Sequence, residues 1–144
     1  MVILAMALAS CGGGNGAPAG PSAQEKGSPL NVTLATGKPV YATGEPIPLT
    51  LTVSNTSKEP VELHFTSGQR YEFVIQNQAG MQMWSWASER LFLQVLGTER
   101  FAPGEERAFT EPFHGTLPAG AYTVTGGLTA REETPEARAT FRIE

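Results

Sequence analysis

Apolar and polar residues alternate along most of the chain from Leu30 onward, and a period of two predicts half-buried β-strands. The clearest run is 47–54, in which Ile, Leu, Leu and Val alternate with Pro, Thr, Thr and Ser. No stretch has a helical period long enough for a regular helix. We expect single helical turns at most, at 87–91 and 134–138. The same alternation predicts further strands over 61–65, 71–76, 122–128 and 141–143.

Turn-forming residues separate these strands at short, regular intervals. Glycine and proline interrupt each run because glycine accepts positive φ and proline cannot continue a strand ladder. Many short strands with frequent turns are typical of a sandwich. The sequence therefore predicts one all-β domain, an immunoglobulin-like antiparallel β-sandwich of seven to nine strands. The turn signals lie at 37–39, 43–44, 57–60, 67–68, 79–80, 103–104 and 118–120.

The segment 117–124, Leu-Pro-Ala-Gly-Ala-Tyr-Thr-Val, gives a more specific architectural signal. Its spacing resembles the tyrosine corner of immunoglobulin-like sandwiches, in which a tyrosine hydroxyl bonds back to an upstream backbone group. We therefore expect Tyr122 to form such a corner, with Gly120 leaving room for the approach. The pair Gly126-Gly127 predicts a bulge or a close backbone approach inside the same strand.

The N-terminus carries a different pattern. Residues 1–10 are apolar or small, and Cys11, the only cysteine, follows them and precedes a glycine-rich stretch. The four residues 8–11, Leu-Ala-Ser-Cys, resemble a bacterial lipobox, although no basic residue precedes the apolar run. The sequence thus predicts a lipoprotein signal segment over 1–11 with Cys11 as the lipidation site, a disordered Gly/Pro/Ala linker over 12–29, and the folded domain over 30–144. It places the protein at the cell envelope, lipid-anchored on the extracytoplasmic side of the membrane.

Composition narrows the possible partners and the chemistry. The formal net charge of −4 and the pI near 5.2 disfavour nucleic acid, because no basic stripe is available to neutralise phosphates. A single cysteine cannot form an intramolecular disulfide, so the domain depends on its apolar core. All 14 acidic residues are glutamate, which excludes mechanisms that require aspartate.

The candidate chemical groups do not assemble into a catalytic or metal motif. His64 and His114 are the only histidines, and two histidines 50 positions apart do not supply the three or four ligands that zinc requires. The adjacent pairs 105–106 and 132–133 are better explained as solvated turn charges than as a glycosidase pair. No nucleophile elbow is present. We therefore expect no enzyme activity, no cofactor and no metal.

Residues 49–104 carry a family resemblance. The segment contains an Asn-Thr turn, a Phe-x-Ser-Gly-Gln-x-Tyr-x-Phe strand pair, a Gly-x-x-x-Trp hairpin and a downstream Phe, and it is similar to the intracellular proteinase inhibitor (BsuPI-like) domain family. The resemblance implies inhibition of a serine protease, but it maps no reactive-site motif onto this chain. The family name says intracellular, whereas the Cys11 motif indicates export. The residues concerned are Asn55, Thr56, Phe65, Ser67, Gly68, Gln69, Tyr71, Phe73, Gly80, Trp84, Trp86 and Phe92.

Three motif features have direct physical interpretations. Asn55 is expected to fold its side chain onto the backbone two residues later and shape a turn. Residues 67–69 are expected to close a hairpin between Phe65 and Tyr71, with Gly68 free to adopt positive φ. Trp84 and Trp86 have the same parity, so one strand would project both indoles from one face. That face either packs in the core or forms an exposed apolar patch.

The candidate partners are a protease or another envelope protein. For a protease inhibitor, Arg70 beside Gln69, and Arg90, are candidate specificity residues for a trypsin-like pocket. For a structural or assembly role, an edge strand or the Trp84/Trp86 face is the candidate contact surface. A ligand-sensing role would use the same indole face. The three functions remain open at the level of sequence, and each is non-enzymatic.

Overall fold

The computed structural model describes residues 28–144. The predicted signal segment 1–11 with its lipidation site Cys11, and residues 12–27 of the predicted linker, lie outside the described residues. The ordered strands begin at Leu30. Within the described part of the chain, no helix is long and apolar enough to cross a membrane.

The described residues form ten β-strands and a single turn of 3₁₀ helix, which confirms the all-β prediction, with one strand more than the seven to nine expected. The elements are β1 (Leu30–Thr36), β2 (Val40–Tyr41), β3 (Ile47–Asn55), β4 (Val61–Phe65), β5 (Tyr71–Asn77), β6 (Gln82–Ser85), η1 (Ala87–Glu89), β7 (Gly97–Phe101), β8 (Glu106–Phe113), β9 (Gly120–Leu128) and β10 (Glu136–Ile143).

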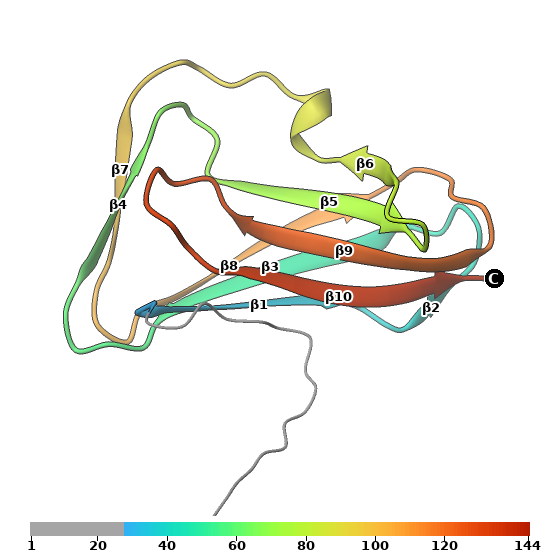
Figure 1. Cartoon of the computed structure of the whole chain (residues 1–144), viewed down its shortest axis with the longest axis horizontal. Helices are drawn as coiled ribbons and strands as arrows, with labels where there is room; N and C mark the ends of the chain where they lie inside the picture. The colour runs from blue at the N-terminus through green and yellow to red at the C-terminus, as the bar shows by residue number, and fades with distance from the viewer. Residues whose placement is uncertain (1–27) are drawn as a thin grey trace, which may run out of the picture.

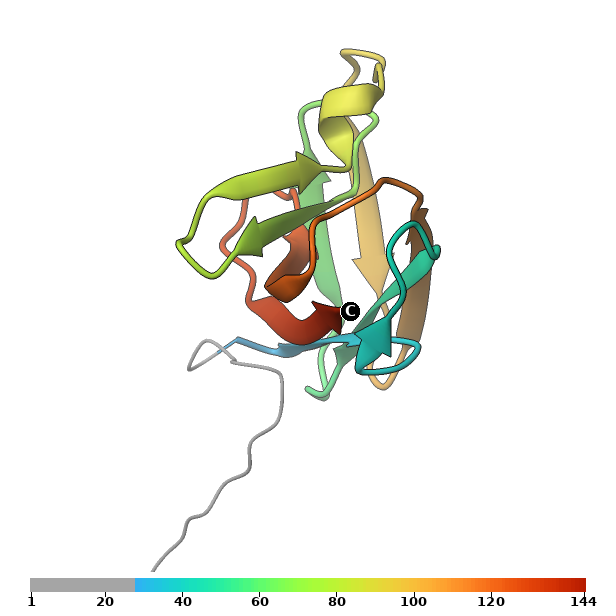
Figure 2. The same ribbon diagram turned by 90° about the vertical axis from the view of Figure 1, so that its right-hand side faces the viewer.

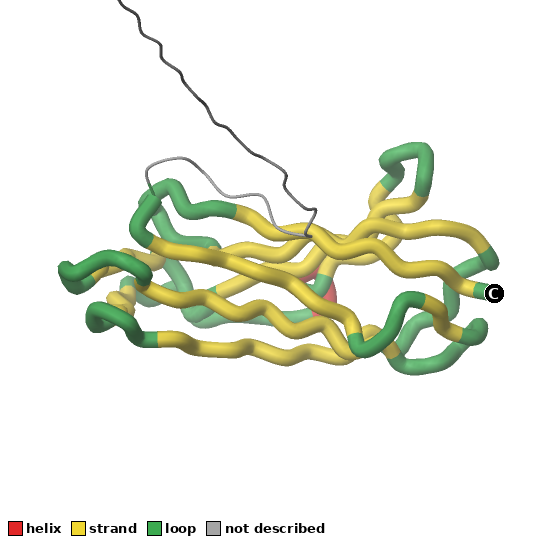
Figure 3. Tube along the Cα trace, turned by 90° about the horizontal axis from the view of Figure 1, so that it is seen from below, coloured by secondary structure: helices red, strands yellow, loops and turns green. Residues whose placement is uncertain are grey.

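Two sheets make the sandwich, and a third, small sheet stands at one end of it (Figure 1). One layer has the strand order β1-β3-β8, and the other has the order β2-β10-β9-β5-β6. The pair β4-β7 forms the third sheet. All pairings are antiparallel except that of the two-residue strand β2, which runs parallel to β10. Figure 3 shows the strands running along the long axis, with loops gathered at the ends.

The core lies between the two large sheets because the alternating apolar residues of both face inward. Along β3, every second residue is buried, and Leu51 is fully enclosed. On the opposite layer, Phe73 and Gly126 are paired neighbours. A Cβ placed on Gly126 would lie 3.2 Å from the Phe73 ring and 3.3 Å from Leu51, so the glycine allows close packing of the layers. The expected close approach is confirmed, and β9 passes through it without a bulge.

The tyrosine corner is present. The Tyr122 hydroxyl donates to the carbonyl oxygen of Pro118 at 2.6 Å. Gly120 has φ of 151°, a conformation that residues with a side chain rarely adopt. The Tyr122 ring stacks on Phe141 with centroids 5.6 Å apart, so the corner is joined to the next strand. This hydrogen bond fixes the connection into β9 in the way the sequence predicts.

The two expected helical turns have different outcomes. Residues 87–89 do form one 3₁₀ turn, as predicted. Residues 134–138 do not, because β10 begins at Glu136 and buries Ala137, Ala139 and Phe141 in strand alternation. The need to fill the sandwich core with every second side chain outweighs the weak local helix preference of this segment.

Candidate functional site

An exposed apolar segment connects η1 to β7. We call residues 90–96, Arg-Leu-Phe-Leu-Gln-Val-Leu, the strap. Leu91 is 99% exposed, Leu93 74% and Leu96 82%, and Val95 is also exposed. A small domain rarely exposes several large apolar side chains that lie close together in the chain. Exposed apolar patches of this kind mark interaction sites. In Figure 2 this yellow segment and η1 stand at the top of the molecule, beyond the two sheets.

The strap is attached to the domain at its start and near its middle. The Arg90 guanidinium lies 4.5 Å from the Trp86 ring centroid, and the Phe92 ring centroid lies 5.6 Å from the same indole. The carbonyl oxygen of Leu93 accepts a hydrogen bond from the Gly68 N–H at 2.8 Å. The strap is therefore held over the 66–70 loop by one backbone hydrogen bond and two ring contacts.

Trp86 anchors this arrangement from inside the domain. Its indole is 6% exposed and stacks on Tyr71 with centroids 4.8 Å apart. The backbone N–H of Trp86 donates to the Phe73 carbonyl at 2.9 Å. The Tyr71 hydroxyl donates to Glu111 at 2.5 Å, and burial together with this carboxylate raises the pKa of Tyr71 to about 12. Tyr71 is thus a neutral, fixed support beneath the indole.

The two indoles do not share one strand face, so the sequence expectation is wrong on this point. Strand β6 ends at Ser85, and Trp86 has φ of −60° and ψ of −42°, which is a helical conformation. The change from extended to helical backbone breaks the parity that links residues two positions apart. Trp84 is half-buried and meets the Phe113 ring edge-on at 5.0 Å, while Trp86 packs under the strap. No joint indole patch forms.

The expected hairpin between Phe65 and Tyr71 is also not formed. Strand β4 pairs with β7, and β5 pairs with β6 and β9, so residues 66–70 cross from the small sheet to the five-stranded sheet. Gly68 is not among the glycines with positive φ. A Cβ at this position would lie 3.7 Å from the strap backbone at Leu93, which is an ordinary contact distance, so the structure does not require glycine here.

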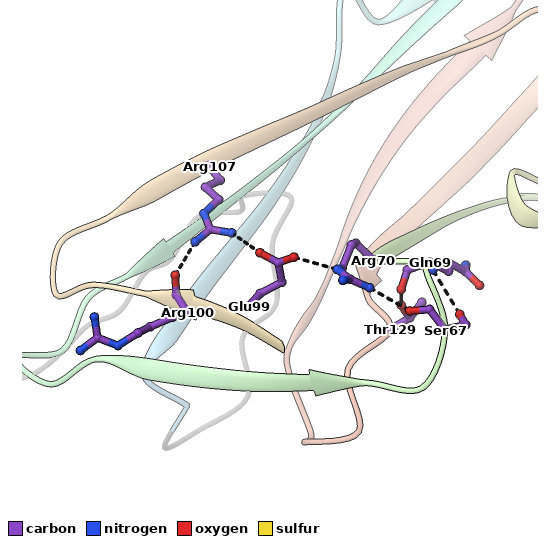
Figure 4. Close-up of polar contacts among 7 residues, drawn as sticks. All are labelled: Ser67, Gln69, Arg70, Glu99, Arg100, Arg107 and Thr129. Atoms are coloured by element: carbon purple, nitrogen blue, oxygen red, sulfur yellow. Dashed lines mark hydrogen bonds and ion pairs between the residues drawn. The ribbon is translucent and has the colours of Figure 1, made fainter. Parts of the chain in front are cut away.

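Gln69 and Arg70 are both engaged within the domain (Figure 4). The Gln69 side chain donates to the Tyr71 carbonyl at 2.9 Å. Arg70 donates to Glu99 at 2.9 Å and to the Ser67 carbonyl at 2.8 Å, and its guanidinium lies over the Phe65 ring at 4.5 Å. These contacts tie the 66–70 loop to β4 and β7, directly below the strap.

Glu99 links Arg70 to a second guanidinium. Arg107 donates to the other Glu99 oxygen at 3.0 Å and lies over the Phe101 ring at 4.1 Å. The hydrogen bond from Arg70, followed by that from Arg107, holds the pKa of Glu99 below its usual range, although partial burial acts in the opposite direction. The row Arg70-Glu99-Arg107 thus joins the small sheet to β8 of the three-stranded sheet and to the 66–70 loop that leads into β5.

A second polar cluster lies away from the strap. Glu132, in the β9–β10 connection, accepts the His64 backbone N–H at 2.8 Å and lies 2.5 Å from His64 Nδ1. Glu62 approaches the other ring nitrogen at 3.7 Å. The hydrogen bonds from the His64 side chain and backbone lower the pKa of Glu132 to about 2. Among residues 28–144, no group of three or more metal-ligating side chains is placed to hold an ion.

The lowered pKa of Glu132 predicts an acid-sensitive contribution to stability. A folded-state pKa below the usual value of 4.5 stabilises the fold above pH 4.5, and the contribution is lost as the pH falls toward about 2. We expect Glu132→Gln to lower the free energy of unfolding at pH 6 and to have little effect near pH 2. Denaturant unfolding at both pH values measures this, with the adjacent exposed Glu133→Gln as the control. An equal effect of Glu132→Gln at both pH values would contradict the assignment.

A known protein family matches the sequence of the domain described above. The sequence model of the family described as intracellular proteinase inhibitor, BsuPI, matches residues 34–133, which is most of the chain. The chain belongs to the BsuPI family. The matched region includes the strap, the anchoring residue Trp86 and the row Arg70-Glu99-Arg107, so the resemblance expected from the sequence motif is confirmed. Comparison with curated proteins gives no significant match.

Several solved structures of other proteins have a similar sandwich fold. The C-terminal domain of Wzt superposes with a TM-score of 0.58 at 12% identity, covering 85% of this chain and 78% of that one. Spo0M, the sporulation control protein from Bacillus subtilis, gives 0.55 at 15%, covering 81% and 50%. The alkylpurine DNA glycosylase AlkC from Pseudomonas fluorescens gives 0.52 at 15%, covering 82% and 31%. The chain thus spans about a third of the glycosylase and half of Spo0M, and these likenesses show the fold alone.

The five residues proposed as protein contacts lie at four places in the BsuPI domain. Gln69 and Arg70 brace the loop beneath the strap, Trp86 is buried under it, and Trp84 lies apart beside Phe113. Arg90 is exposed at the beginning of the strap.

The sequence alone did not identify the four exposed aliphatic residues of the strap, Leu91, Leu93, Val95 and Leu96. Their signal was a run of six residues over 91–96, five of them apolar, that fits no half-buried strand and yet is not enclosed by turn residues. Such a run is normally assigned to a buried strand.

Proposed function

We propose that this BsuPI-family protein is a non-enzymatic inhibitor that presents the strap to the active-site cleft of a proteinase. The observation that carries the proposal is the exposure of three leucines, Leu91, Leu93 and Leu96, on a segment whose backbone is fixed to the domain. The family description supplies the protease as partner. Binding, and not chemistry performed by this chain, is the proposed activity.

The physical requirements of a protease inhibitor agree with the strap. A cleft that binds extended peptide takes side chains from an accessible segment, and interface cores are enriched in apolar residues. Ordering a flexible loop on binding costs affinity, so a segment that is already ordered binds more tightly. Trp86, Phe92 and the Gly68–Leu93 hydrogen bond supply that order without a covalent cross-link.

Titration of the full chain against chymotrypsin, elastase and trypsin tests the proposal. We expect inhibition of at least one protease, and we expect a triple variant with serine at Leu91, Leu93 and Leu96 to weaken it at least about tenfold through the lost apolar burial. Met81→Ser is the matched control, because Met81 is 61% exposed in the turn before β6, away from the strap. Failure to inhibit any protease, or equal inhibition by the triple variant, would refute the proposal.

We further propose that the protein acts while anchored at the cell envelope by lipid on Cys11. The support is the lipobox-like sequence 8–11 and the glycine-rich stretch that follows it. Membrane fractionation of cells that express the full chain tests this proposal. The wild-type chain should sediment with membranes and carry an N-terminal acyl mass, whereas Cys11→Ser should remain unmodified. An unmodified thiol in membrane-free wild-type material would exclude the anchor.

An assembly role at the envelope is the second candidate, and one observation favours it. Strand β6 is the outer strand of the five-stranded sheet, so its far backbone edge offers a position for strand addition. Ligand sensing through paired indoles has no comparable support, because Trp86 is buried. Affinity capture with the strap triple variant separates the first two roles, since strand addition at β6 does not require the leucines.

A further inference from the structure

Leu91 holds a distinct position within the strap. It is 99% exposed, while the residues on both sides of it, Arg90 and Phe92, contact the Trp86 ring. The two neighbouring side chains therefore turn back to the domain, and the leucine between them projects into water. Leu93 differs because its backbone carbonyl is bonded to Gly68. Leu91 is the strap side chain that is most accessible and has anchored neighbours on both sides.

Arg70 and Arg90 are less suited than Leu91 to enter a specificity pocket of a protease. Arg70 pairs with Glu99, bonds the Ser67 carbonyl and covers the Phe65 ring. Arg90 lies over Trp86. To enter an acidic specificity pocket, either guanidinium would have to give up partners that stabilise the loop or the strap. Leu91 gives up only its contact with water, and burial of an exposed apolar side chain is favourable.

We propose that Leu91 is the residue that enters the primary specificity pocket of the target, and that the target is a protease whose pocket accepts a large apolar side chain. This inference rests on the proposed function and adds the specificity of the same site. Chymotrypsin-type pockets are apolar slots, whereas trypsin-type pockets hold a carboxylate that selects lysine or arginine. The proposal therefore excludes the trypsin-like target suggested by Arg70 and Arg90.

The contacts below Leu91 explain how the side chain is held in place. The 3₁₀ turn η1, residues 87–89, leads into the strap: the Arg90 N–H donates to the Ala87 carbonyl at 3.1 Å, and the Ser88 hydroxyl donates to the Ser85 carbonyl at 2.7 Å. The Ala87 N–H donates in turn to Glu72 Oε1 on β5 at 3.0 Å. The backbone that leads into Leu91 is thus joined to β5 of the five-stranded sheet. Binding therefore requires little further ordering of this backbone.

A change of specificity tests the inference with the full chain. Chymotrypsin and trypsin are titrated with the wild type, Leu91→Ala, Leu91→Lys, Leu93→Lys and the control Met81→Lys. We expect the wild type to inhibit chymotrypsin more strongly than trypsin, and Leu91→Ala to weaken chymotrypsin inhibition at least about tenfold. Leu91→Lys should lose chymotrypsin inhibition and gain trypsin inhibition, because the lysine reaches the carboxylate of that pocket. Met81→Lys should match the wild type.

The outcomes separate this inference from the proposed function. Stronger inhibition of trypsin than of chymotrypsin by the wild type would overturn the inference, and so would a specificity change produced by Leu93→Lys in place of Leu91→Lys. In both cases the proposed function would stand. If the wild type inhibited none of chymotrypsin, trypsin and elastase, both the inference and the proposed function would be overturned. Thermal unfolding of each variant serves as the folding control, and a side chain that is 99% exposed should leave the unfolding temperature unchanged.

Discussion

Replacing Trp86 with alanine is expected to lower the free energy of unfolding by about 3–5 kcal/mol, the usual cost of truncating a large buried ring. The indole is enclosed by Tyr71, Phe92 and the Arg90 guanidinium, so its removal opens a cavity between the sheet and the strap. The strap would lose both ring contacts at its start. Denaturant unfolding measures the first effect, and limited proteolysis within 90–96 measures the second.

Two further variants, Trp86→Phe and Trp84→Ala, serve as controls for Trp86→Ala. Within residues 28–144, the Trp86 Nε1 atom is buried and has no hydrogen-bond partner. Trp86→Phe therefore loses volume but no polar contact, and it should cost less than half as much as alanine. Trp84→Ala removes a half-buried indole beside Phe113 and should leave the strap protected from proteolysis. A Trp86→Ala variant as stable and as resistant as Trp84→Ala would contradict the anchoring role.

Strand positions could be predicted from the sequence because alternation is a local property. The run 47–54 is β3, which extends one residue further to Asn55, and 61–65 is β4 with the same bounds, since in both strands alternate side chains enter a core. Strand β8 was not identified. Its inner positions are Arg107, Phe109 and Glu111, which are only half-buried and give no apolar alternation. Strands that carry charged residues on the inner side at a sheet edge escape a rule based on hydrophobicity.

Strand pairing could not be predicted in the same way, because it depends on residues far apart in the chain. Phe65 and Tyr71 are six residues apart and suggest a hairpin, yet β4 finds its partner in β7, more than 30 residues later. The row Arg70-Glu99-Arg107 braces this arrangement, because its half-buried charged groups link the 66–70 loop to β7 and β8. No local sequence pattern distinguishes an arginine that pairs within its own domain from one that is free to bind a protease.

The family was identifiable from spaced aromatic residues, whereas the candidate site was not. Trp86 and Phe92 are two of the motif residues, and their rings contact each other where the strap is attached to the domain. Leu91 makes no such contact, so nothing in the motif marks it. Its importance depends on exposure, which only the folded arrangement defines.

Asn55 is the second position at which a large loss of stability is expected. Its side chain is 1% exposed, donates to the carbonyls of Glu59 and Phe101 at 2.7 and 3.0 Å, and accepts the Ser57 N–H at 3.0 Å and the Ser57 hydroxyl at 2.7 Å. The sequence predicted only the local turn. The bond to Phe101 joins β3 to β7, so the side chain also holds the small sheet against the sandwich.

We expect Asn55→Ala to lower the free energy of unfolding by about 3 kcal/mol, because each buried polar group left without a partner costs about 1–3 kcal/mol. Asn77→Ala is the matched control. Asn77 also ends a strand and accepts two backbone N–H groups, from Ala79 and Met81, but these bonds are exposed and water can replace them. That variant should cost about 1 kcal/mol or less. Equal losses from the two variants in denaturant unfolding would mean that Asn55 acts only in its own turn. A larger loss from Asn55→Ala would instead place the asparagine of the family's Asn-Thr motif among the residues that hold β7, and hence the far end of the strap, in position.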